Sequence, residues 1–222
     1  MAHGSFITLG AYFTYVLSVA LGVNIFISVL ASAVCVGLLA VLSEQLVFKR
    51  VRGTGAFGSL APIVASLGLL FVLDNSILFI WGVRPKSLEY YPGLIIFQGA
   101  RITYVQFLIV TVSFASMFLF HLLLTKTKLG KAMRAVSDNP DLALCSGIDS
   151  QTIINSTWFV ALFYSAIGGS LTALDTQVWP QLGFAQLLDI FSAVTVGGIG
   201  NPYGAMLGAV LIGSVQNFGV SI

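Results

Sequence analysis

The chain has 222 residues, of which 57% are hydrophobic and 8% are charged, with 10 basic and 8 acidic side chains. A water-soluble domain carries about a quarter charged residues, so this composition excludes a soluble globular protein. The net charge of +2 is small and the basic residues lie in loops, which gives nucleic-acid binding no support. The sequence is therefore typical of a protein embedded in a lipid bilayer.

Long uncharged stretches predict several membrane-spanning helices. A bilayer core about 30 Å thick is crossed by about 20 apolar helical residues. In chain order, we expect helices over Ser5–Leu21, Asn24–Phe48, Ser59–Trp81, Tyr104–Leu124, Thr152–Leu174, Ala185–Gly197 and Tyr203–Gly219. The predicted fold is all-α, a polytopic transmembrane bundle of about six to seven spans or half-spans that forms one domain, residues 1–222.

Two basic loops orient this bundle. They contain Lys49, Arg50, Arg52, Lys126, Lys128, Lys131 and Arg134, which are 7 of the 10 basic residues. The positive-inside rule places both loops in the cytoplasm. The segment Gly82–Thr103 then lies outside, where the Pro92-Gly93 turn signal and the apolar run Leu94–Phe97 predict a small hairpin.

The polar segment 126–150 is the longest interruption of the apolar sequence, and it contains signals for a short helix. Asn139 is a favourable cap, a proline follows it, and Gly147 suits the left-handed stop. Together they predict a helix over Asp141–Ser146, with the acidic Asp141 at its positive end.

The residues before this helix, Lys131–Ser137, predict a helical turn of their own. Lys131 and Arg134 are one turn apart and lie on one side. We expect the two short helices to form a cytoplasmic docking loop for a soluble partner. A solvated connector is the alternative, but a connector gains nothing from defined helix ends.

A glycine-rich stretch near the C-terminus predicts a broken helix. Gly197, Gly198 and Gly200 precede Pro202, and non-helical backbone at membrane depth is tolerated where it lines a cavity or is covered by protein. These glycines are therefore candidates for lining a transport pathway. The alternative is a tight loop beside a packing face, because small residues recur every fourth position from Gly200 to Gly208.

Asp74 and Asp189 are the acidic residues closest to the interior of predicted spans. A carboxylate at membrane depth is costly and marks a functional site by default. Both are candidates for the pathway, although Asp74 late in its helix and Asp189 early in its own also fit the outer interface.

Motifs of hydrolases, metalloproteases and phosphate-binding loops are absent from the sequence. The isolated His3 and His121 have no second ligand at a metal spacing. We therefore expect no catalytic residues, no metal and no cofactor, and a chain that does not itself split ATP.

Four motifs occur in order along the chain. They are Met1-Ala-His-Gly4 with Leu9-Gly-Ala-Tyr12, Phe48-Lys-Arg-Val-Arg-Gly53, Gly130-Lys-Ala-Met-Arg-Ala135, and Val196-Gly-Gly-Ile-Gly200 with the glycines at 204 and 208. The set resembles the membrane subunits of ABC importers for branched-chain amino acids, a family that also serves urea and short amides. Arg50 departs from the pattern, since proline is usual there.

The resemblance implies an inner-membrane permease that works with cytoplasmic ATP-binding subunits, a second permease subunit and a periplasmic substrate-binding protein. It also implies two groups of residues. By resemblance, Gly130, Arg134, Ala135, Asn139 and Gly147 would form the ATPase-docking surface, and the helix signals described above add Lys131 and Asp141 to it. His3, Gly4, Gly197, Gly198 and Gly200 would border the pathway by resemblance, and Asp74 and Asp189 join them as carboxylates close to span interiors.

The resemblance also leads us to expect a chain shortened at both ends, without the helix that precedes Ala-His-Gly and without the usual final helix. A non-transporting membrane scaffold is therefore one alternative function. A proton-coupled secondary transporter or channel that uses Asp74 or Asp189 is the other.

Overall fold

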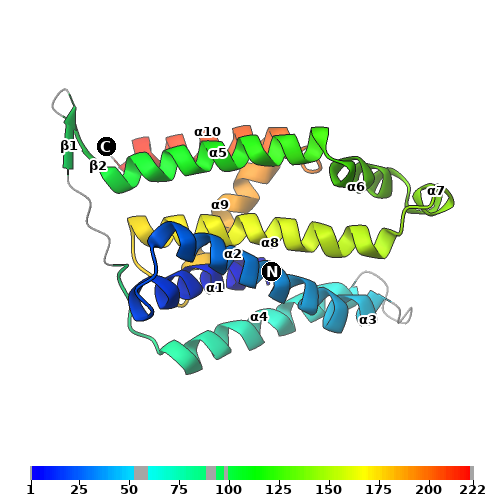
Figure 1. Cartoon of the computed structure of the whole chain (residues 1–222), viewed down its shortest axis with the longest axis horizontal. Coiled ribbons are helices and arrows are strands. Elements are labelled where there is room, and N and C mark those ends of the chain that lie inside the picture. Colours follow the sequence, from blue (N-terminus) through cyan, green and yellow to red (C-terminus); the bar gives the residue numbers. More distant parts are fainter. Residues whose placement is uncertain (1, 53–59, 89–93, 98–99, 221–222) are drawn as a thin grey trace.

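The computed structural model describes residues 2–52, 60–88, 94–97 and 100–220, which form a bundle of helices (Figure 1). The helices are α1 (His3–Tyr15), α2 (Ile25–Ser43), α3 (Lys49–Arg52), α4 (Leu60–Trp81), α5 (Tyr104–Lys126), α6 (Lys128–Asp138), α7 (Pro140–Cys145), α8 (Ser150–Asp175), α9 (Leu182–Gly197) and α10 (Pro202–Val220). Two π-helical turns, η1 (Val16–Ala20) and η2 (Glu44–Phe48), extend α1 and α2. The predicted helical bundle is confirmed.

Within these residues, four helices are long and apolar enough to cross a membrane. They are the continuous helix Ile25–Val51 and the helices α4, α5 and α8, while α9 is a shorter apolar helix. A lipid-facing surface explains why so many large apolar side chains are exposed on α4, α5 and α10. The chain is thus a multi-pass membrane protein.

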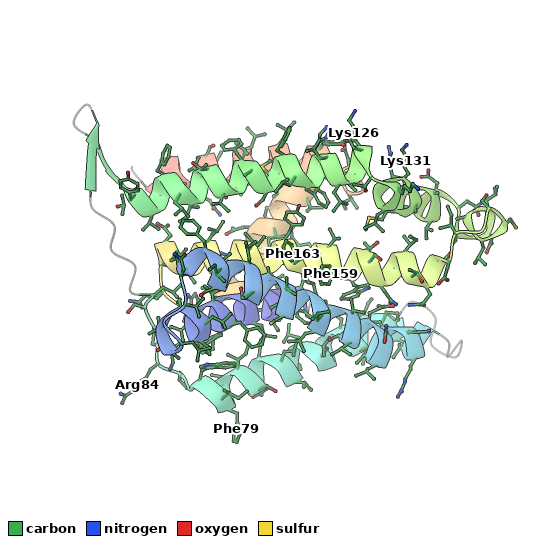
Figure 2. The ribbon with its side chains drawn as sticks, in the orientation of Figure 1. Phe79, Arg84, Lys126, Lys131, Phe159 and Phe163 are labelled. Carbon is green, nitrogen blue, oxygen red and sulfur yellow. The ribbon has the colours of Figure 1, made fainter. Side chains whose placement is uncertain are left out.

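The two strands β1 (Leu94–Phe97) and β2 (Ala100–Thr103) pair antiparallel, so the predicted hairpin is confirmed. The Pro92-Gly93 turn signal lies outside the described residues. The hairpin lies at the end of the bundle where α4 and α8 finish, and α3, α6 and α7 lie at the opposite end (Figure 1). Figure 2 shows Arg84 at the hairpin end, and Lys126 and Lys131 at the other. The two predicted basic loops therefore share one end.

Helix α1 forms the centre of the bundle and is buried along nearly its whole length. It contacts α2, α4, α8 and α9. Small residues bring it close to α8: a Cβ added to Gly10 would lie 2.6 Å from the Cα of Ala166, and one added to Gly169 would meet the carbonyl oxygen of Ile7. In a bilayer, such close backbone approach is a main source of helix association.

Three buried hydroxyl groups join the same helices. The Thr14 hydroxyl of α1 lies 2.8 Å from the Ser32 hydroxyl of α2 and 2.8 Å from the Ser170 hydroxyl of α8. All three side chains are fully buried, so each hydroxyl would be destabilising without its partners. The cluster fixes α1, α2 and α8 relative to one another.

The adjacent glycines of α8 provide a test of this packing. Gly169→Ala is expected to lower the melting temperature of the detergent-purified protein, because overpacking against α1 costs about 1–3 kcal/mol. Gly168 has no neighbour within 4 Å of an added Cβ, so Gly168→Ala should be neutral or stabilising through helix propensity. Equal melting temperatures for the two variants would contradict the packing.

Candidate functional site

The corner between α5 and α6 is fixed by two residues. The Thr127 hydroxyl accepts a hydrogen bond from the Gly130 N–H at 3.0 Å and so caps α6. Gly130 is buried, and an added Cβ would collide with the backbone of Leu123 and Leu124 in the last turn of α5. Gly130 therefore positions α6 and offers no surface to a partner.

Helix α7 has defined ends, as the sequence predicted. The Asn139 side chain accepts hydrogen bonds from the N–H groups of Asp141 at 3.1 Å and Leu142 at 3.0 Å. At the other end, Gly147 has a φ of 80°, and the N–H groups of Gly147 and Ile148 donate to carbonyls of the last helical turn. This Schellman arrangement satisfies the free carbonyl groups and stops the helix. The predicted docking loop thus consists of two ordered helices.

The exposed surface of these two helices carries basic and apolar groups. Lys128, Lys131 and Arg134 recur every third residue of α6 and are exposed. On α7, Leu142 is 64% exposed and Leu144 is 59% exposed. We call these five residues the docking face.

The other predicted docking residues surround this face. Asn139, Asp141 and Gly147 are exposed, and Ala135 is half-buried. Sequence reasoning missed Leu142 and Leu144, although two leucines in a segment that faces water are themselves a signal for a partner.

Asp149 caps α8 and lies within reach of the charge of Lys49 on α3. Its carboxylate accepts hydrogen bonds from the N–H groups of Gln151 at 3.1 Å and Thr152 at 3.3 Å. A hydrogen bond from the Thr152 hydroxyl, with the backbone N–H groups and the charge of Lys49, lowers the pKa of Asp149 from its ordinary value. The carboxylate is therefore ionised at neutral pH, where it stabilises the positive end of α8.

The predicted pathway residues His3 and Gly4 lie at the beginning of α1. The His3 Nε2 atom lies 2.7 Å from the Ser165 hydroxyl of α8. The Thr8 hydroxyl accepts a hydrogen bond from the Gly183 N–H at 3.0 Å, and Gly4 is buried against the backbone of Gly183. These contacts hold the first turn of α9 against α1.

Helices α9 and α10 form a tight hairpin. Gly198 and Gly200 in the connecting turn have φ values of 94° and 91°, so the predicted break of the helix is confirmed. The Asn201 side chain caps α10 by accepting from the N–H groups of Tyr203 at 3.1 Å and Gly204 at 3.2 Å. Gly197 packs directly on Gly204, so this glycine serves the close approach of the two helices.

The two acidic residues lie in different surroundings. Asp74 is half-buried two turns before the end of α4, beside Ser5 of α1. Asp189 is exposed and accepts a hydrogen bond from the Gln216 side-chain nitrogen of α10 at 2.6 Å.

The expectation that Asp189 lies early in its helix is wrong. The predicted start was Ala185, but α9 begins at Leu182, so Asp189 lies halfway along it. The helix can begin before Ala185 because the N–H group of Gly183, which has no partner within α9, donates a hydrogen bond to the Thr8 hydroxyl on α1.

The chain is similar to known proteins along its whole length. The family model described as branched-chain amino acid transport system / permease component matches residues 1–222. The chain belongs to this family.

Several known permease proteins are similar to most of this chain. BraD of Pseudomonas aeruginosa, a high-affinity branched-chain amino acid transport system permease protein, is 28% identical over 100% of this chain and 76% of its own length. LivH of Escherichia coli K12, of the same description, is 26% identical over 97% of this chain and 74% of its own length. MglC of Salmonella typhimurium, a galactose/methyl galactoside import permease protein, is 26% identical over 75% of this chain and 53% of its own length. No solved structure matches the chain.

The capped α7 of this permease gives a direct prediction. Asn139→Ala removes the acceptor of two N–H groups and should destabilise α7 by about 1 kcal/mol. Amide hydrogen exchange over residues 141–145 should become about fivefold faster. Asn139→Asp keeps a capping oxygen and should exchange at nearly the native rate; acceleration in both variants alike would count against the cap.

Proposed function

We propose that this chain is an inner-membrane permease subunit of an ABC importer for branched-chain amino acids, driven by ATP that a partner subunit hydrolyses. The observation that carries the proposal is the ordered docking face, which lies at the end of the bundle where both basic segments lie (Figure 2). Family membership supports the substrate class.

The docking face suits a folded protein partner. The charged groups of Lys128, Lys131 and Arg134 attract an acidic surface, and the exposed Leu142 and Leu144 offer apolar area for burial. We propose that residues 126–150 form the ATPase-docking loop and that a cytoplasmic ATP-binding subunit covers this face.

Movement of the docking face has a direct route into the bundle. Helix α6 contacts both α5 and α8, and its Gly130 lies against the last turn of α5. Near the end of α5, the His121 Nδ1 atom lies 3.1 Å from the Tyr203 hydroxyl, in the first turn of α10. A push on α6 therefore reaches both the centre of the bundle, through α8, and the glycine turn that joins α9 and α10.

The remaining family partners complete the transport cycle that we propose. A second permease subunit pairs with this one, and a periplasmic binding protein delivers the amino acid at the hairpin end. Alternating access follows when the ATP-binding subunits approach each other and the α5–α6 corner shifts. Among the predicted pathway residues, Asp189 and the turn glycines Gly198 and Gly200 are exposed, whereas Gly4 and Gly197 act through close packing.

Charge reversal on the docking face tests the partner. Arg134→Glu should reduce co-purification of the ATP-binding subunit at least tenfold, while the permease still accumulates in the membrane, because like charges across an interface cost several kcal/mol. The matched control is Arg84→Glu, an equal change at the opposite end of the bundle (Figure 2), which should leave co-purification unchanged.

Two outcomes would contradict the proposal. One is native co-purification with the Arg134 variant. The other is amino-acid uptake by vesicles that hold this chain without any ATP-binding subunit under a pH gradient, since that result belongs to a proton-coupled transporter.

A further inference from the structure

The Asp189 carboxylate is exposed in the middle of an apolar helix. It lies eight residues before the end of α9, about 12 Å along the axis at 1.5 Å per residue. Leu188, Ile190 and Phe191 beside it are large, apolar and exposed. The surface around Asp189 is thus apolar enough for a membrane, while the carboxylate itself is not.

Lipid is not a suitable neighbour for this carboxylate. A charge at the bilayer centre is costly, so such groups face water-filled cavities or paired groups on protein. Gln216 donates to Oδ1 at 2.6 Å and fixes the orientation of the carboxylate. Among the described residues, no lysine, arginine or histidine forms an ion pair with it.

A positive charge that pairs with Asp189 would have to come from outside these helices. Helices α1, α2, α4, α8, α9 and α10 contain no lysine or arginine, and the only one in α5 is its last residue, Lys126. A second copy of this chain would bring no basic residue at that depth either. A small cationic group that travels through the pathway meets the requirement.

On the same side of α9, the neighbours of Asp189 are small. One turn before Asp189 lies Ala185 and one turn after it lies Ser192, and both are small and exposed. The Ser192 hydroxyl donates its proton to the Leu188 carbonyl at 2.8 Å, so its oxygen keeps free lone pairs as an acceptor. A carboxylate and a hydroxyl acceptor one turn apart favour a ligand that donates.

We infer that Asp189, oriented by Gln216, binds the ammonium group of the amino acid during its passage. This inference rests on the proposed function and adds a specific contact to it: an ion pair between the substrate N–H donors and a carboxylate on α9. Gln216 is a positioning residue, since it acts through the carboxylate.

The test is leucine uptake by the assembled importer, that is, this permease with its ATP-binding subunits, second permease and binding protein. Asp189→Asn keeps the shape and removes the charge. It should lower uptake roughly 10- to 100-fold, the range expected when a hydrogen bond to a charged group is lost. Asp189→Glu keeps the charge and should recover part of the uptake. Co-purification of all subunits should be native in both variants.

A second measurement asks whether position 189 meets water. In a background with Cys35→Ala and Cys145→Ala, Asp189→Cys should react with a charged, membrane-impermeant thiol reagent, and leucine should slow the reaction. Phe71→Cys is the control, because Phe71 is 63% exposed on the apolar α4 and faces lipid. It should stay unreactive.

The outcomes separate this inference from the proposed function. If the assembled importer with the unchanged chain does not take up leucine, the proposed function is wrong. Native uptake by the Asp189→Asn importer overturns the inference alone, because a neutral side chain then suffices. Loss of the second permease from the purified Asp189→Asn complex, with no labelling at position 189, also overturns it, because Asp189 would then pair with a neighbouring subunit.

Discussion

The bundle depends on one constraint: inside a membrane, polar groups must find partners within the protein, because lipid offers none. The hydroxyl groups of Thr14, Ser32 and Ser170 meet this constraint by bonding to one another across α1, α2 and α8. The same rule applies to the start of α9, whose free N–H group at Gly183 is satisfied by Thr8. Without the Thr8 bond, the N–H group of Gly183 in the first turn of α9 would lose the acceptor that it has on α1.

Close packing extends this core toward the functional elements. Glycines let α1 approach α8 and let α9 approach α10, so the hairpin of α9 and α10 is a compact unit attached to the core at one end. Its turn contacts the end of α5 through Tyr203 and His121. The docking face therefore lies one helix away from the glycine turn, a short path for a mechanical signal.

The features predictable from sequence are those that depend on neighbouring residues. The capped ends of α7 follow from Asn139, Pro140 and Gly147, all within nine residues, and the spans follow from runs of apolar residues. The contact that gives Asp189 its partner joins residues 27 positions apart, and the two bonds of Thr14 join residues 18 and 156 positions apart. The hydrophobic periodicity of the sequence does not indicate which distant residues form such pairs. The π-helical turns were missed for a related reason, since their wider hydrogen bonding leaves no mark in a pattern of 3.6 residues.

The central claim is that the α6–α7 docking face lies in the cytoplasm, and Cys145 tests it most directly because this cysteine is exposed on α7. In a Cys35→Ala background, a membrane-impermeant thiol reagent should label Cys145 in inside-out vesicles and leave it unlabelled in right-side-out vesicles. Labelling in right-side-out vesicles would place the docking face outside the cell, where no ATP-binding subunit reaches it, and would contradict the account.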